Sequence, residues 1–369
     1  MRLTICLAGI LWAASLTAQN VCDQQATKRT RHLYQNLHRI VKDSNLMFGH
    51  QDDLAYGVGW QYLENESDVK RTVGDYPAVF GWDLAHLELD SAKNIDGVPF
   101  DKMRQYIKKV YKMGGVSTIS WHLHNPATGG SAWDTAGMAV RSVLPSGKNH
   151  QLYLNWVDKV ADFLVSLKTD GLFPKRIPII FRPYHEHTGG WFWWGQTHCT
   201  AEEYGLLWRI TVERLREKGV HNALIAYSPD AFLTRTDYMA YYPGDDLVDI
   251  LGHDLYHRNT DSAGNAQFID RVSKNFDIIA DLNKDHHKVA AMTETGLEKI
   301  PCDTWWTDVL WPALQNRQVA YVVVWRNGRP DHFYAPYPAQ ASAENFKRFY
   351  TNEKVCFSTK AKTLKLYRK

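Results

Sequence analysis

Two glutamates in this chain follow short apolar runs, and their placement gives the clearest indication of chemistry. Glu186 comes shortly after Ile177–Phe181, and Glu294 follows Val289–Met292 with only Thr293 between. A lone glutamate is most often a solvated surface charge, but two that follow buried strands point to a cleft. Two carboxyl groups that face each other about 5–5.5 Å apart suit retaining hydrolysis of a glycosidic bond. One would protonate the leaving oxygen, and the other would attack the anomeric carbon.

The residues near these glutamates fit the two roles. The acid must stay protonated near neutral pH, which requires burial or a nearby negative charge, whereas the nucleophile must be ionised. Tyr256 could donate a hydrogen bond to Glu294. Arg182 could lower the pKa of a carboxyl group in the same site, or it could form a buried structural ion pair, and the sequence favours neither interpretation.

Aromatic side chains are abundant, at 13% of the chain with 14 tryptophans. The indole ring can stack on the apolar face of a pyranose, although a tryptophan more often belongs to the core. Residues 189–195 hold Trp191, Trp193 and Trp194, and three rings in four residues cannot all point the same way. We expect Trp191, the nearest to Glu186, to face the cleft. Trp325 is a further candidate platform, and Trp60, Trp82 and Trp133 are weaker ones.

Eight short apolar runs must position these residues. They are Leu46–Phe48, Ala78–Gly81, Val116–Ser120, Ile177–Phe181, Ala223–Ala226, Val248–Leu251, Val289–Met292 and Val319–Val324. Continuous rather than alternating apolarity is typical of strands buried on both faces of a parallel sheet. Segments with helical spacing lie between them: Met103–Met113, Leu152–Leu167, Ala201–Lys218, Phe268–Leu282 and Thr304–Leu314, with a further helix expected near Arg29–Val41.

This alternation predicts a single-domain α/β fold, a (β/α)8 TIM barrel. The alternative is an open doubly wound sheet, which is disfavoured because no glycine-rich phosphate loop follows the first strand. In a (β/α)8 barrel the active site lies at the C-terminal ends of the strands. Almost every run here is followed by polar or aromatic residues, as Glu186 and Glu294 exemplify.

Four motifs together resemble glycoside hydrolase family 26, chiefly its β-mannanases. They are Phe-Arg-Pro-Tyr-His185-Glu186, Trp121-His122-x-x-Asn125-Pro126-x-Thr-Gly-Gly, Thr293-Glu294-x-Gly296 and Val324-Trp325-Arg326-Asn327. The match runs from roughly Asn45 to Asn327. The resemblance implies a retaining (β/α)8 glycoside hydrolase without a cofactor, in which Glu186 is the general acid/base and Glu294 is the nucleophile.

The resemblance also implies a set of substrate-binding residues. It places His185, Tyr256 and Trp325 around the sugar on the non-reducing side of the cleaved bond, with His122 or Asn125 contacting it. It places Arg326 against a sugar further toward the non-reducing end. The implied activity is that of a mannan endo-1,4-β-mannosidase acting on β-mannan, galactomannan or manno-oligosaccharides, either within chains or from their ends.

Several alternatives stay open beside this interpretation. The same fold and carboxylates could cleave β-glucan or β-1,3-xylan. Histidines near the strand ends could serve a metal-dependent hydrolase, but the His-x-His pair usual after the first strand is replaced by His50-Gln51-Asp52. A non-catalytic sugar-binding protein would keep the tryptophans but lose one glutamate, and both are present.

The N-terminus predicts export. Met1-Arg2 and the apolar run Leu3–Leu16, followed by Thr17-Ala18, form a signal peptide with cleavage after Ala18. The expected domains are therefore 1–18, the signal peptide, and 19–369, the catalytic domain of a periplasmic or secreted enzyme. The run is too short to span a bilayer, so no membrane insertion is expected. Val21 before Cys22 disfavours lipidation.

Charge and cysteine content add two expectations. The 43 lysines and arginines exceed the 40 aspartates and glutamates by only three, and no basic stripe suits nucleic acid. The expected partner is the saccharide alone, and the expected state is a monomer or weak dimer. Beyond the signal peptide, two disulfides or free buried thiols are both compatible with the remaining cysteines: Cys22, Cys199, Cys302 and Cys356.

Overall fold

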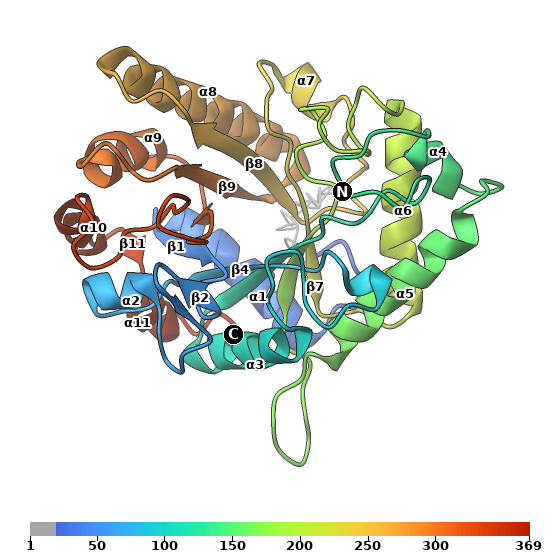
Figure 1. Ribbon diagram of the computed structural model, residues 1–369, viewed down its shortest axis with the longest axis horizontal. Coiled ribbons are helices and arrows are strands. Elements are labelled where there is room, and N and C mark those ends of the chain that lie inside the picture. Colours follow the sequence, from blue (N-terminus) through green and yellow to red (C-terminus); the bar gives the residue numbers. More distant parts are fainter. Residues whose placement is uncertain (1–19) are drawn as a thin grey trace, which may run out of the picture.

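The computed structural model describes residues 20–369, which form a barrel of parallel strands surrounded by helices (Figure 1). The barrel strands are β1 (Leu46–Gln51), β4 (Val79–Asp83), β5 (Val116–Ser120), β6 (Ile179–Arg182), β7 (Ala223–Tyr227), β8 (Ile250–His257), β9 (Val289–Leu297) and β10 (Tyr321–Val324). Each strand pairs with the next in this order, and β10 pairs with β1 to close the ring. Each apolar run overlaps one of these strands, so the predicted (β/α)8 barrel is confirmed.

The strands form here because both of their faces are covered. Apart from two half-buried residues near the end of β8, every residue of the barrel strands is buried. Helices pack on the outside of the ring (Figure 1), and side chains from facing strands fill the inside. A strand in this environment needs apolar residues on both sides, which explains the unbroken apolar runs.

The remaining elements connect the strands. The helical segments are α1 (Lys28–Lys42), α2 (Asp68–Val73), η1 (Leu87–Leu89), α3 (Phe100–Met113), α4 (Ala139–Val143), α5 (His150–Ser166), α6 (Ala201–Glu217), α7 (Arg235–Met239), α8 (Ser262–His286), η2 (Trp306–Leu310), α9 (Trp311–Leu314), α10 (Ala343–Tyr350) and α11 (Ser358–Thr363). The short strands are β2 (Tyr56–Gly57), β3 (Trp60–Gln61) and β11 (Val355–Cys356). Helix α6 begins with a capping box, in which Thr200 and Glu203 exchange side chain–backbone hydrogen bonds.

One segment expected to form a regular α-helix is only partly α-helical. The segment Thr304–Leu314 contains the π-helical turn η2 before α9. Pro312 lies at the start of α9 and has no N–H to donate to a helical hydrogen bond. In a regular α-helix its ring would also clash with the backbone carbonyl four residues earlier. A wider turn before the proline relieves that conflict.

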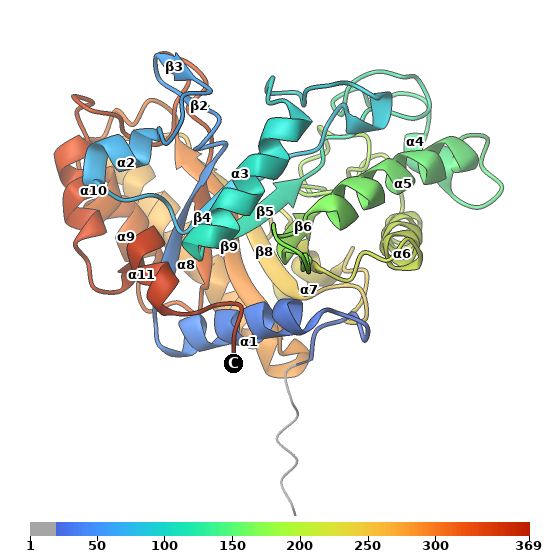
Figure 2. The ribbon, with the colours of Figure 1, turned by 90° about the horizontal axis from the view of Figure 1, so that it is seen from below.

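Helix α1 closes the end of the barrel at which the strands begin (Figure 2). Its buried face carries Leu33, Tyr34, Leu37 and Ile40. These side chains pack in one cluster with residues that point into the barrel, including Met47 of β1. The helix therefore covers the lower end of the barrel interior, and the opposite end stays available for a site.

The predicted signal peptide, residues 1–18, lies outside the described residues. Within residues 20–369, the four cysteines Cys22, Cys199, Cys302 and Cys356 are all free thiols, so the free-thiol alternative is the one observed there. In this part of the chain no helix is long and apolar enough to cross a bilayer.

The covering role of α1 can be tested by stability. Replacing the fully buried Leu37 by alanine should lower the free energy of unfolding by about 3 kcal/mol, because it leaves a cavity under the barrel. The control is Gln35, which is exposed on the same helix: Gln35→Ala should change the free energy of unfolding by less than about 0.5 kcal/mol. Urea denaturation measures both, and equal effects would contradict this role for α1.

Candidate active site

A cavity of about 590 Å³ lies at the C-terminal ends of the barrel strands. Its lining residues are His122, Trp133, Glu186, Trp191, Phe192, Asp230, Asp254, Leu255, Tyr256, Arg258, Glu294, Trp325 and Tyr334. Seven of the residues singled out from the sequence are among them: His122, Trp133, Glu186, Trp191, Tyr256, Glu294 and Trp325. Both glutamates therefore share one cavity, contributed by β9 and by the segment after β6.

Glu294 is aimed by a β-bulge in β9. On β8, His253 and Asp254 are consecutive, but their partners on β9 are Met292 and Glu294, so Thr293 is an extra residue. The pairing of β9 with β10 shifts at the same place. A bulge bends its strand and redirects the side chains beside it, and bulges are frequent next to active sites. The sequence pattern does not show this feature.

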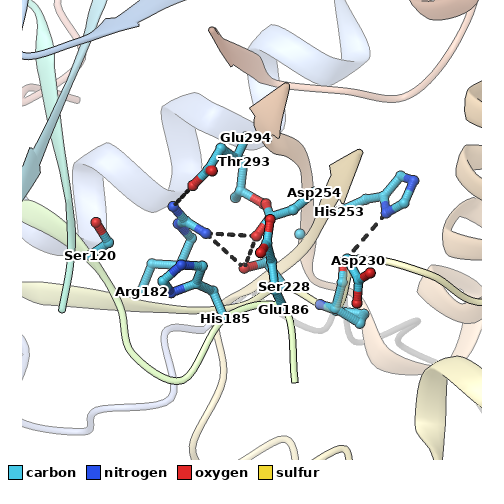
Figure 3. A network of polar contacts seen from close by, with 12 residues as sticks. Ser120, Arg182, His185, Glu186, Ser228, Asp230, His253, Asp254, Thr293 and Glu294 are labelled. Carbon is cyan, nitrogen blue, oxygen red and sulfur yellow. Dashed lines mark hydrogen bonds and ion pairs between the residues drawn. The ribbon is translucent and has the colours of Figure 1, made fainter. Parts of the chain in front are cut away.

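Both carboxyl oxygens of Glu294 accept hydrogen bonds. Tyr256 Oη donates to Oε1 at 2.7 Å, which confirms the contact expected from the sequence. Arg182 Nη2 donates to Oε2 in a buried ion pair (Figure 3). A carboxyl group that accepts at both oxygens, once from a guanidinium, is bonded as a carboxylate. Glu294 therefore has the surroundings of a nucleophile.

Glu186 has the opposite surroundings. Its side chain is buried, and its Oε2 accepts one hydrogen bond, from Trp191 Nε1 at 3.0 Å. Burial raises the pKa of Glu186 well above its ordinary value, and the negative charges of Glu294, Asp254 and Asp230 raise it further. This direction of the pKa shift suits a general acid, because the carboxyl group keeps its proton to a higher pH than an ordinary glutamate does.

The backbone at Glu186 is unusual. Its φ of 53° lies in the left-handed region, as does the φ of 49° at Tyr184. Side-chain-bearing residues rarely adopt this conformation, and where they do the surrounding structure must hold them in it. The Glu186 N–H donates to the Ser228 carbonyl at 2.8 Å, which fixes the acid's backbone against the segment after β7.

Arg182 joins two strands below the cavity. Besides Glu294 it contacts Asp254 on β8, with Nη1 to Oδ2 at 2.6 Å (Figure 3). Asp254 also accepts from Ser228 and Thr293. Burial raises the pKa of Asp254, whereas Arg182, Thr293 and Ser228 lower it because they bond to its ionised form. Both interpretations of Arg182 thus hold at once, because it pairs with a site carboxylate and with a buried structural one. Sequence reasoning had assigned no role to Asp254.

His122 and His185 form a second polar chain on the other side of the cavity. His122 Nδ1 lies 2.7 Å from Asp83 Oδ2, and its Nε2 lies 3.1 Å from His185 Nε2. Burial alone would lower the pKa of His122, but the Asp83 carboxylate raises it above its ordinary value. Burial, with Arg182 and His122 nearby, lowers the pKa of His185. These opposite directions favour His122 as the donor and neutral His185 as the acceptor in this contact.

The aromatic loop divides its rings between cavity and core. Trp193 and Trp194 are fully buried, with their Nε1 atoms donating to backbone carbonyls. Trp191 is 42% exposed and lines the cavity, as expected. Trp133, a weaker candidate from the sequence, is 49% exposed and stacks on the His122 ring at 5.4 Å. Trp325 is half-buried beside them.

Three predicted substrate contacts are not among the residues that line this cavity: His185, which is buried against His122, and Asn125 and Arg326. Asn125 is fully buried, and its amide bonds within its own loop, donating to the carbonyls of Asp134 and Ala136 and accepting from Ala127 N. It therefore shapes the loop that carries Trp133. Arg326 lines a separate cavity of about 470 Å³ with Tyr56, Trp60 and Asp96, and its Nε lies 3.0 Å from Asp96 Oδ1.

The histidines near the strand ends are individually paired. His50 Nδ1 lies 2.7 Å from Asp53 Oδ1, and His253 Nε2 lies 2.9 Å from Asn275 Nδ2. Within residues 20–369, no three or more histidine, cysteine, aspartate or glutamate side chains are grouped as a metal site would require.

Several known proteins are similar to this chain in both fold and sequence. The chain is similar to the structure of a GH26 β-mannanase from Bacteroides ovatus, with 46% identity, a TM-score of 0.86, and coverage of 90% of this chain and 95% of that one. It is similar to the catalytic domain of a GH26 endo-β-1,4-mannanase from Bacillus sp. JAMB-750, with 34% identity, a TM-score of 0.86, and 95% and 96% coverage.

A curated mannan endo-1,4-β-mannosidase from Bifidobacterium adolescentis is 35% identical over 94% of this chain, but the match spans only 36% of that longer relative. Residues 22–324 match the family described as glycosyl hydrolase family 26. Together with the closed barrel and its two cavity glutamates, this match shows that the chain belongs to glycosyl hydrolase family 26 and is a glycoside hydrolase.

Proposed function

We propose that this protein is a mannan endo-1,4-β-mannosidase that hydrolyses β-mannan, galactomannan or manno-oligosaccharides with retention of anomeric configuration. The observation that carries the proposal is that two glutamates in one cavity have opposite surroundings. Glu294 accepts hydrogen bonds from Arg182 and Tyr256 at its two carboxyl oxygens, whereas burial and negative neighbours raise the pKa of Glu186. The names of the relatives supply the mannan specificity.

In the first step, Glu186 donates its proton to the glycosidic oxygen as the bond to the anomeric carbon breaks. Glu294 attacks that carbon from the opposite face and forms a glycosyl ester, and the shortened saccharide leaves with the Glu186 proton. Tyr256 and Arg182 hold the two oxygens of Glu294, so little reorientation is needed during the attack.

The second step uses the same residues in reverse. Once Glu294 is esterified its negative charge is gone, and that charge is one of the causes that raise the pKa of Glu186. The pKa of Glu186 therefore falls in the intermediate, and the ionised carboxylate can take a proton from water. The water oxygen attacks the anomeric carbon, Glu294 leaves as a carboxylate, and the product keeps the β-configuration.

Trp191, Trp133 and Trp325 are the sugar platforms in this proposal. Each presents a ring to the cavity that holds both glutamates. Stacking on an indole face requires a pyranose with axial hydrogens on one side, and the polar groups around the rings then distinguish hydroxyl positions. Besides the two glutamates, the polar groups that line the same cavity include His122, Tyr256 and Arg258.

Product analysis on parallel substrates tests the proposed substrate. Soluble galactomannan and linear manno-oligosaccharides should yield a series of manno-oligosaccharides, while barley glucan and β-1,3-xylan should not be cleaved. Chromatography of the products measures this outcome. Cleavage of the glucan or xylan alone would keep the two-glutamate chemistry but refute mannan as the substrate.

Removal of the nucleophile should abolish turnover. Glu294→Ala should lower kcat by at least about 10⁴-fold on every substrate, because no other group can form the glycosyl ester. The control is Glu353→Ala, an exposed glutamate outside the cavity, which should keep the rate. Reducing-sugar release measures both, with manno-oligosaccharide binding as the check of folding. A rate near that of the unmodified enzyme would refute the assignment.

Removal of the acid should depend on the leaving group. On mannan, Glu186→Ala should lower kcat/KM by roughly 10²–10⁴-fold, and much less on an activated aryl mannoside whose leaving group needs little protonation. Because the raised pKa of Glu186 keeps it protonated, the unmodified enzyme should lose activity as pH rises through that pKa. This alkaline loss should be absent from the variant's profile on the aryl substrate. Equal losses on both substrates would argue against the acid role.

A further inference from the structure

The loop between α5 and β6 carries two exposed apolar side chains at its tip. Leu172 is 87% exposed and Phe173 is 76% exposed, more than any other large hydrophobic side chain within residues 20–369. The loop projects away from the barrel as the green extension at the lower edge of Figure 1. We refer to Leu172 and Phe173 as the apolar tip. The catalytic cavity makes no use of them.

The base of the loop is closed, so the apolar tip is held away from the core. Thr169 N–H donates to the Lys175 carbonyl at 2.9 Å, and Lys175 N–H donates to Thr169 Oγ1 at the same distance. Ile177 N–H donates to the Leu167 carbonyl at 2.9 Å. These bonds fix both arms of the loop. Without them the loop could fold its two apolar residues back onto the protein surface.

One arm of the loop borders a depression of about 720 Å³, which we call the basic depression. Its other walls come from the start of α1 and from the C-terminal residues. Its cations are Lys28, Arg29, Lys175, Arg176, Arg368 and Lys369. No aspartate or glutamate side chain lines it. Arg29 also has a buried Nη1 without a hydrogen-bond partner.

We propose that the apolar tip and the basic depression together bind the surface of an anionic phospholipid bilayer. The tip would enter the boundary between headgroups and acyl chains, and headgroup phosphates would occupy the depression. An apolar contact with cations beside it is the arrangement by which proteins bind such surfaces. Two apolar side chains are too small a patch for a stable protein interface, which buries about 1,200 Å² or more.

The position of the loop sets the orientation of the bound enzyme. The loop leads into the start of β6, so it lies at the end of the barrel where the strands begin. The catalytic cavity lies at the opposite strand ends, around Glu186 and Glu294. Docking through the apolar tip would therefore leave the cavity open to saccharides in solution. This inference goes beyond the proposed function and does not depend on it.

Vesicle co-sedimentation tests the proposal. The purified enzyme should bind phosphatidylcholine vesicles that contain about 30% phosphatidylglycerol, and the binding should weaken as salt rises from about 50 to about 500 mM. It should not bind pure phosphatidylcholine vesicles. The double variant Leu172→Ser/Phe173→Ser should bind about tenfold more weakly, because it removes the apolar contact. The double variant Lys28→Glu/Lys175→Glu should bind anionic vesicles at least about tenfold more weakly, because each positive charge near an anionic surface adds to the attraction.

Matched variants at the opposite end of the barrel serve as controls. Leu233 is 71% exposed in the segment after β7, and Lys148 is exposed in the segment before α5. Leu233→Ser and Lys148→Glu should keep vesicle binding, and all variants should keep their rate on soluble substrate as evidence of folding. Failure of the enzyme to bind anionic vesicles would overturn the proposal. So would equal binding to neutral vesicles, or equal loss in the control variants.

Discussion

The whole site depends on one buried guanidinium. Arg182 lies between Glu294 and Asp254 and is the cation that pairs with both. Removing one member of a buried ion pair leaves an uncompensated charge, which costs about 3–5 kcal/mol. Arg182 therefore fixes the geometry of Glu294, the proposed nucleophile, links β6 to β8 and β9, and limits the negative charge that faces Glu186. The closed barrel brings the side chains of these strands, which are not neighbours of β6 in the sheet, within reach of Arg182.

This charge arrangement also explains how one pair of carboxyl groups can perform two steps. The pKa of Glu186 is raised because burial and the charges of Glu294, Asp254 and Asp230 disfavour its ionised form. In the proposed mechanism, esterification of Glu294 removes one of those charges, so that the acid of the first step becomes the base of the second. The fixed backbone of Glu186, with its φ of 53°, keeps the carboxyl group in place throughout.

The sequence was sufficient for the barrel and for the two glutamates, because the closed parallel sheet demands unbroken apolar runs and places whatever follows them at one end. The sequence was insufficient for the features that depend on local backbone geometry. The extra residue Thr293 in β9, the left-handed backbone at Glu186 and the loop bonds of Asn125 leave no periodic signal. Nothing in the sequence pattern marks Asp254, because its importance comes from Arg182 on β6, which reaches it past the intervening strand β7.

The most direct test of this account is the ionisation of Glu186 itself. A carbon-13 NMR titration should find its pKa well above the ordinary glutamate value in the unmodified enzyme. In Glu294→Gln the neutral amide removes one negative neighbour, so the pKa of Glu186 should fall while burial keeps it above the ordinary value. An unshifted pKa in the unmodified enzyme, or the same pKa in both proteins, would contradict the coupling of the two carboxyl groups.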